Sequence, residues 1–136
     1  MPLLVIRHAR AGERSEWQGD DRKRPLDEKG RRQAAALVDE LARFPITRIL
    51  SSPYDRCVQT VEPLAAARGL EIELRDELGE ERQSSEGVAL VRSLADDDVA
   101  VCVHGGLSDA AFDEGQKKAE TLVVDGEGRV VERRRV

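Results

Sequence analysis

The sequence is poor in aromatic residues, cysteine and histidine. One tryptophan, one tyrosine and two phenylalanines occur among 136 residues, so a core must be built mainly from leucine, valine and alanine. The two cysteines, Cys57 and Cys102, lie in apolar segments without CxxC spacing, which favours free buried thiols over a disulfide. The two histidines, His8 and His104, have no cysteine or carboxylate at ligand spacing, so we expect no metal and no cofactor.

The sequence also lacks long apolar runs and an excess of basic over acidic residues. No segment approaches the ~18 apolar residues of a membrane span, and the first residues lack the basic start and longer apolar stretch of a signal peptide. The net charge of −5 argues against wholesale binding to nucleic acid or an anionic membrane. We therefore expect a cytoplasmic protein with no nucleic-acid or membrane partner. The length favours a single domain over residues 1–136.

Apolar strand patterns alternate with helical patterns along the chain. Strands are predicted at residues 3–6, 46–50, 70–74 and 99–103, and a hairpin at TLVVDGEGRVV. Helices are predicted from an N-cap at Asp27 to Phe44, from the SSPYDRC turn to Gly69, and through Val88, Val91 and Leu94. Pro63 is expected to kink or divide the second helix. This alternation predicts an α/β fold, a three-layer αβα sandwich with a mostly parallel central sheet and an antiparallel edge hairpin.

Polar residues follow three of the predicted strands. In open α/β sheets, ligands bind beyond the carboxyl ends of the strands. Both histidines fall at this edge of the predicted sheet, and two arginines, two serines and two glycines join them. In chain order the set is Arg7, His8, Ser51, Ser52, Arg56, His104, Gly105 and Gly106.

Two histidines among arginines suit chemistry on phosphate. The guanidinium groups of Arg7, Arg56 and Arg24 have the planar donor geometry to surround one phosphoryl group. A neutral imidazole among them can attack phosphorus, and the second imidazole can stabilise charge on the phosphoryl oxygens. The product would be a phosphohistidine that water hydrolyses, and a carboxyl group with a raised pKa would serve the leaving group.

Four sequence blocks resemble those of one enzyme family. VIRHARAG resembles the RHG-type signature of the histidine phosphatase superfamily, with Ala9 where glycine is commonest. DRKRPLDEKGRRQA and ILSSPYDRCVQT resemble the next two blocks of the small SixA-like phosphohistidine phosphatases, and VAVCVHGG resembles the strand that ends in the family's second histidine. The chain is also similar to the phosphatase-like domain that follows Nudix hydrolase domains in some actinobacterial proteins. The resemblance implies a phosphoglycerate-mutase-like fold.

The resemblance also assigns roles to residues. It implies His8 as the nucleophile, Arg7 and Arg56 as phosphate ligands, and His104 as the second histidine of the phosphate pocket. Arg24 matches the additional arginine of the SixA-like group. The L-x-E context of the family acid falls on Glu80, with Glu81 and Glu77 as competitors. Ser52 and Gly105 are expected to line the substrate site.

The short chain bears on the substrate. It has no room for the long insertions with which mutase and phytase relatives cover a small substrate. An open site favours phosphohistidine or another phosphoprotein as substrate. A phosphatase acting on nucleotides or small phosphate esters is the alternative enzyme hypothesis, and a phosphate-binding regulatory module without turnover is the third.

Overall fold

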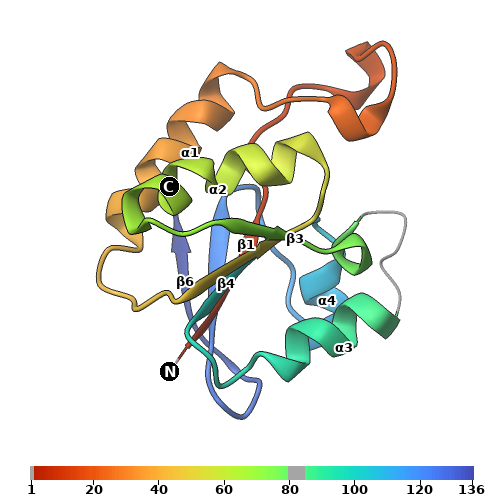
Figure 1. Ribbon diagram of the computed structural model, residues 1–136. Coiled ribbons are helices and arrows are strands. Elements are labelled where there is room, and N and C mark those ends of the chain that lie inside the picture. The colour runs from red at the N-terminus through yellow and green to blue at the C-terminus, as the bar shows by residue number, and fades with distance from the viewer. Residues whose placement is uncertain (1, 80–84) are drawn as a thin grey trace.

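A mixed β-sheet forms the centre of the computed structural model, which describes residues 2–79 and 85–136 (Figure 1). Along the chain, the strands are β1 (Leu3–Arg7), β2 (Arg48–Ser51), β3 (Ile72–Leu74), β4 (Val99–Val103), β5 (Glu120–Val124) and β6 (Val130–Arg135). They lie in the order β3-β2-β4-β1-β5-β6. β3, β2, β4 and β1 are parallel, whereas β5 is antiparallel to β1 and β6 is antiparallel to β5. The predicted parallel sheet with an antiparallel edge hairpin is confirmed.

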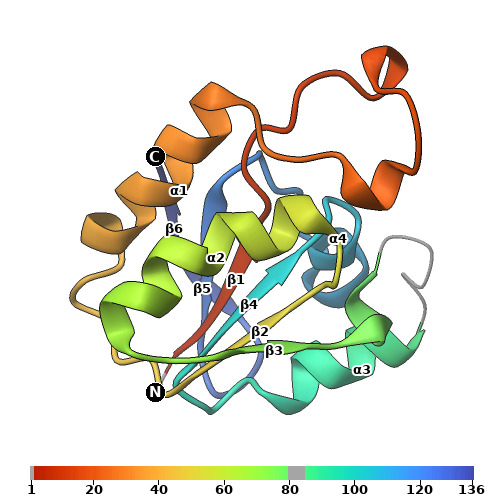
Figure 2. The same cartoon turned by 45° about the horizontal axis from the view of Figure 1, so that its top comes forward.

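Helices cover both faces of this sheet, as Figures 1 and 2 show. They are α1 (Glu28–Glu40), α2 (Asp55–Arg68), α3 (Ser85–Ser93) and α4 (Leu107–Phe112). Alternate side chains of each strand point to opposite faces. In β1, Leu4 and Ile6 pack in the cluster of α1 and α2, whereas Leu3 and Val5 pack in the cluster of α3 and α4. The three-layer arrangement follows from strands that are apolar on both faces.

Asp27 and Gly69 cap helices as predicted, whereas α1 ends at Glu40, four residues before the predicted end at Phe44. The Asp27 carboxylate accepts a hydrogen bond from the Gly30 amide at 2.8 Å and caps α1. Gly69 ends α2 in the left-handed conformation, at φ 64°. Of the two expected effects of Pro63, a kink or a division of the helix, the division is wrong, because α2 continues through the proline. In the part of the chain that the structure describes, no helix has the length and apolar character needed to cross a membrane.

The two edges of the sheet differ from its centre. β4 and β5 are buried at every residue, whereas side chains of β6 alternate between half-buried and exposed. β3, at the opposite edge, has three residues. The polar segment 11–24, predicted as a loop, contains two short 3₁₀ turns, Arg14–Glu16 and Asp21–Lys23, and lies over the carboxyl end of β1 (Figure 2). The parallel strands therefore end beneath a polar loop.

Candidate functional site

His8 lies immediately after β1 and is 6% exposed. Its backbone amide donates to the Val103 carbonyl at 3.1 Å, which continues the β1–β4 pairing. Its Nδ1 lies 2.8 Å from the carbonyl oxygen of Ala9, and a carbonyl can only accept. The neutral ring therefore carries its proton on Nδ1 and has its lone pair on Nε2.

Burial, together with the charges of His104, Arg56 and Arg7, lowers the pKa of His8 to about 3 and outweighs the hydrogen bond to Ala9, which alone would raise it. The imidazole of His8 is thus neutral at physiological pH. A buried, neutral ring with a defined tautomer is suited to donate an electron pair from Nε2.

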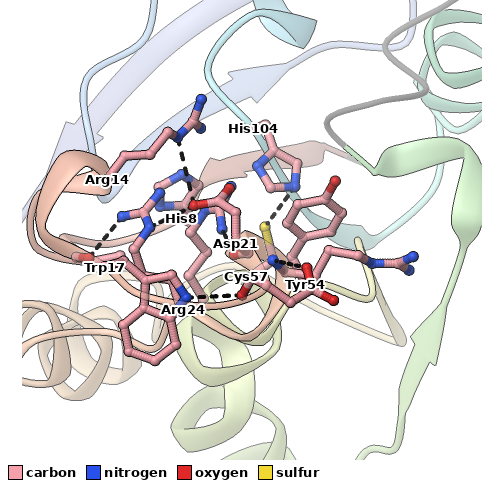
Figure 3. Close-up of polar contacts among 12 residues, drawn as sticks. His8, Arg14, Trp17, Asp21, Arg24, Tyr54, Cys57 and His104 are labelled. Carbon is pink, nitrogen blue, oxygen red and sulfur yellow. Dashed lines mark hydrogen bonds and ion pairs between the residues drawn. The ribbon is translucent and has the colours of Figure 1, made fainter.

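His104 follows β4 and meets His8 across the parallel β1–β4 pair. The two ring centroids are 5.5 Å apart, and the ring planes are inclined by 67° (Figure 3). The Nε2 atom of His104 lies 2.9 Å from the Ser52 hydroxyl and 3.6 Å from the Cys57 thiol. Tyr54 packs edge-on against the same ring, at 4.7 Å between centroids. The sheet therefore brings together the two histidines that are far apart in the sequence.

Arg7, the last residue of β1, is held from two sides. Its Nη1 donates to the Gln116 carbonyl at 2.6 Å. Gly105 lies against the guanidinium plane, because a Cβ at this position would be 2.8 Å from Arg7 Cζ. Glycine therefore allows the guanidinium to lie flat against the backbone that follows β4.

Arg24 and Arg56 share one carboxylate, that of Asp21. Arg24 Nε donates to Asp21 Oδ1 at 2.9 Å, and Arg56 Nη2 donates to Oδ2 at 3.1 Å. Arg14 lies 3.6 Å from the same group. Burial alone would raise the pKa of Asp21, but the Arg24 hydrogen bond and the charges of these three arginines outweigh it, so the pKa is lowered. Asp21 is therefore ionised and neutralises part of an arginine-rich site.

A cavity of about 230 Å³ opens at this edge of the sheet. Four predicted site residues line it, namely Arg7, His8, Arg24 and Gly105. Four residues that were not predicted complete the lining: Gly12, Glu13, Arg14 and Lys118. Arg56, Ser52 and His104 are buried and are not part of this lining. Glu80 and its competitor Glu81 fall outside the described residues. Among the residues that are described, no group of three histidine, cysteine or acidic side chains is placed to hold a metal ion.

Sequence reasoning missed Asp21 and the contacts of Cys57. Asp21 stands directly before the basic run Arg22–Arg24, and this DDRKR pattern was a signal for a carboxylate among arginines. Cys57 and Cys102 are free and buried as predicted, but Cys57 was assigned only to an apolar helix face. Its contact with His104 depends on the packing of α2 against β4, which periodicity does not reveal.

Comparison with known proteins identifies the family. Residues 3–88 match the model of the histidine phosphatase superfamily (branch 1). The chain belongs to this superfamily. It is 56% identical over 63 residues to an 8-oxo-(d)GTP phosphatase of Mycolicibacterium smegmatis, a match that covers 46% of this chain. The chain spans about a fifth of the length of that relative, since the match covers 20% of it.

Solved structures show the same fold over nearly the whole chain. The protein histidine phosphatase SixA complexed with tungstate has a TM-score of 0.80 at 21% identity, covering 99% of this chain and 97% of that one. A putative phosphohistidine phosphatase SixA from Agrobacterium tumefaciens has a TM-score of 0.79 at 24% identity, covering 97% and 96%. The phosphoglycerate-mutase-like fold implied by the sequence blocks is confirmed.

Proposed function

We propose that this protein is a phosphatase that forms a covalent phosphohistidine on His8. The single observation that carries the proposal is the state of this imidazole. It is buried, neutral and oriented by the Ala9 carbonyl, and it lines the same cavity as Arg7 and Arg24. A neutral nucleophile surrounded by cations is what attack on an anionic phosphate requires.

The proposed reaction has two steps at phosphorus. In the first, the Nε2 lone pair of His8 forms a bond to phosphorus while the bond to the leaving group breaks. In the second, water attacks phosphorus, the phosphorus–Nε2 bond breaks, and inorganic phosphate leaves with His8 neutral again. Arg7, Arg56 and His104 would stabilise the charge on the phosphoryl oxygens, with Arg24, Ser52 and Gly105 completing the site.

The leaving group of an ester needs a proton in the first step. Glu80 remains our prediction for this acid, and it falls outside the described residues. Asp21 is unsuited to the role, because its pKa is lowered and it is therefore ionised at neutral pH. A phosphoramidate leaving group needs less assistance, so phosphohistidine is the substrate that depends least on a strong acid.

Trapping the intermediate tests this mechanism. Wild-type protein and His8→Ala are mixed with ³²P-labelled substrate, quenched in alkali and digested, because phosphohistidine survives alkali but not acid. We expect label on the peptide containing His8 in the wild type and none in His8→Ala. Label on a different residue, or turnover by His8→Ala at the wild-type rate, would contradict the covalent mechanism. If both proteins bind vanadate but neither turns over substrate, the protein is a phosphate-binding module.

Two substrate classes remain to be separated. The open cavity supports phosphohistidine on a protein, as predicted from the short chain. The relative named as an 8-oxo-(d)GTP phosphatase favours a nucleotide, with 56% identity over 63 residues. Values of kcat/KM for a phosphohistidine peptide and a nucleoside monophosphate, measured with the same preparation, decide between them. A ratio above ten in either direction assigns the class.

A further inference from the structure

A second hollow adjoins the cavity of His8. It also has a volume of about 230 Å³, and we call it the Trp17 pocket after its aromatic wall. Its lining is Ala11, Gly12, Glu13, Glu16, Trp17, Arg24, Pro25, Leu26 and Asp27. Gly12, Glu13 and Arg24 line the His8 cavity as well, so the two spaces share a wall. The two spaces are therefore close enough for one ligand to occupy both.

Trp17 is the chain's only tryptophan, and its side chain does not pack in the hydrophobic core. It is 37% exposed, and its indole N–H donates to the Asp20 carbonyl at 2.9 Å. That hydrogen bond satisfies the polar atom of the ring and restrains its orientation, so the exposed part of the side chain is apolar. Figure 3 draws Trp17 together with His8 and Arg24 at this end of the sheet. An exposed, oriented indole can stack on a planar group.

The remaining lining indicates what kind of planar group fits. The apolar residues of the lining are Ala11, Pro25 and Leu26, and its acidic residues are Glu13, Glu16 and Asp27. The carboxylates repel a further phosphate but accept hydrogen bonds from N–H donors. A nucleobase whose edge carries such donors, as that of guanine does, combines a stacking face with the required polarity.

We propose that the Trp17 pocket is the base subsite for a guanine-type nucleoside phosphate, and that stacking on Trp17 determines the preference for phosphate compounds that carry a base. The inference rests on the proposed function, because it requires the phosphate to lie in the His8 cavity. Trp17 acts on the base and not on phosphorus. Loss of its indole should therefore affect nucleotides more than phosphate compounds that lack a base.

A ratio of specificities tests this role. For each variant, kcat/KM is measured for guanosine 5′-monophosphate and for ribose 5-phosphate, which has the same phosphate and sugar without the base. Stacking on one aromatic side chain contributes about 1–3 kcal/mol, so Trp17→Ala should lower the ratio of the two values about tenfold. Trp17→Phe should retain most of the ratio. Val131→Ala, which removes an apolar side chain 61% exposed on β6, is the matched control and should leave it unchanged.

Two results would overturn the inference. One is an unchanged ratio in Trp17→Ala. The other is an equal loss of kcat/KM for a phosphohistidine peptide, since the pocket would then recognise a feature of a phosphopeptide. Circular dichroism of each variant confirms that the fold is retained, and Trp17→Phe supplies the comparison if Trp17→Ala does not fold.

Fluorescence separates this inference from the proposed function, because Trp17 is the single tryptophan in the chain. In the His8→Ala protein, guanosine 5′-monophosphate should quench the emission with a saturable curve, and ribose 5-phosphate should not. Free N-acetyltryptophanamide corrects for absorption by the nucleotide. Saturable quenching without any turnover by the wild type would support the base subsite and contradict the phosphatase. Turnover without saturable quenching would contradict the base subsite alone.

Discussion

Arg56 donates to Asp21 through both terminal nitrogens, to the backbone carbonyl at 2.8 Å and to the carboxylate at 3.1 Å. Arg56 is 0% exposed and sits in the first turn of α2, whereas Asp21 belongs to the 11–24 loop. A buried guanidinium needs a compensating negative charge, which the loop supplies. The same carboxylate also neutralises Arg24 and so competes with any phosphate for these arginines.

Removing the charge of Asp21 should therefore strengthen anion binding. In Asp21→Asn, the backbone contact to Arg56 can persist while one negative charge is lost from the site. Near a protein surface, a unit charge several ångströms away contributes on the order of 1 kcal/mol, so sulfate should bind about fivefold more tightly. Calorimetric titration at low ionic strength measures the change.

Asp20→Asn is the matched control for this experiment. It changes the net charge equally, and its amide oxygen can still accept from the Arg22 amide as the Asp20 carboxylate does. The sulfate affinity of Asp20→Asn should stay within about twofold of the wild type. Weaker binding in Asp21→Asn would mean that the carboxylate chiefly orients the arginines.

Gly105→Ala should reduce activity more than stability. The added Cβ would lie 2.8 Å from Arg7 Cζ and 2.9 Å from Nε, and the guanidinium can move aside because it ends a flexible side chain. In the proposed mechanism Arg7 holds the phosphate, and displacing such a group by about 1 Å costs on the order of a hundredfold in rate. We expect kcat/KM for p-nitrophenyl phosphate to fall tenfold or more, with a small change in Tm.

Gly30→Ala should, in contrast to Gly105→Ala, reduce the stability of the fold. Its Cβ would lie 1.9 Å from the Arg10 carbonyl oxygen, a backbone atom that cannot move without shifting the chain. Overpacking of this kind costs about 1–3 kcal/mol or more, so Tm should fall. If Gly105→Ala were to lose as much Tm as Gly30→Ala, steric displacement of Arg7 would not explain its loss of activity.

The buried neutral state of His8 should make folding sensitive to acid. The pKa of His8 is about 3 in the folded protein and about 6.5 when the chain is unfolded. Below pH 6.5 the unfolded chain takes up a proton that the folded protein does not, so His8 lowers stability progressively as the pH falls toward 3. The slope approaches about 1.4 kcal/mol per pH unit within this window.

His8→Asn removes this contribution while keeping a small polar side chain. Urea unfolding at pH 7.5, 5.5 and 4.5 gives the free energy of unfolding of both proteins. The wild type should lose more stability than His8→Asn over this range. Parallel losses would show that folding does not lower the pKa of His8.

Cys57 should give anion binding a dependence on pH. Burial would raise its pKa, but hydrogen bonds with Cys102 and His104 and the charges of His104 and Arg56 lower it to about 6. Above that pH a thiolate lies 3.6 Å from His104 Nε2 and adds negative charge near the site. Sulfate, which keeps its charge over this range, should therefore bind more weakly as the pH rises through about 6.

The comparison of Cys57→Ala with Cys102→Ala isolates this thiolate. Cys57→Ala should lose the thiolate's contribution to the pH dependence of sulfate binding. The pKa of Cys102 is raised well above its usual value, mainly by burial, so Cys102 remains a thiol. Cys102→Ala removes a hydrogen bond that lowers the pKa of Cys57. The sulfate affinity of Cys102→Ala should therefore still fall with rising pH, but at a higher pH than in the wild type. A transition retained in Cys57→Ala would exclude the thiolate as its source.

Much of the fold could be predicted because β1 and β4 carry unbroken apolar runs. Val99–Val103, the most apolar of them, is β4 and lies inside the sheet between β1 and β2. The meeting of His8 and His104 followed from the same rule, since parallel strands end at one edge. Helix α4 was not predicted, because its six residues are too few to show helical periodicity.

The electrostatic details of the site could not be predicted in the same way. The contact between Asp21 and Arg56 joins residues 35 positions apart through a loop without apolar periodicity. The orientation of the Cys57 thiol toward His104 depends on how α2 packs on the sheet. Periodicity identifies which face of an element is buried, but it does not specify which side chains make contact there.

The charged side chains of β6 also bear on self-association. An edge strand with unpaired backbone groups can pair with the edge of another molecule. Along β6, Glu132, Arg133 and Arg134 form ion pairs with Arg43, Glu114 and Glu40, respectively, so this edge is crowded with charge. At the opposite edge, β3 has only three residues on which a second sheet could align. Both edges thus disfavour the edge-to-edge strand pairing through which exposed sheets aggregate.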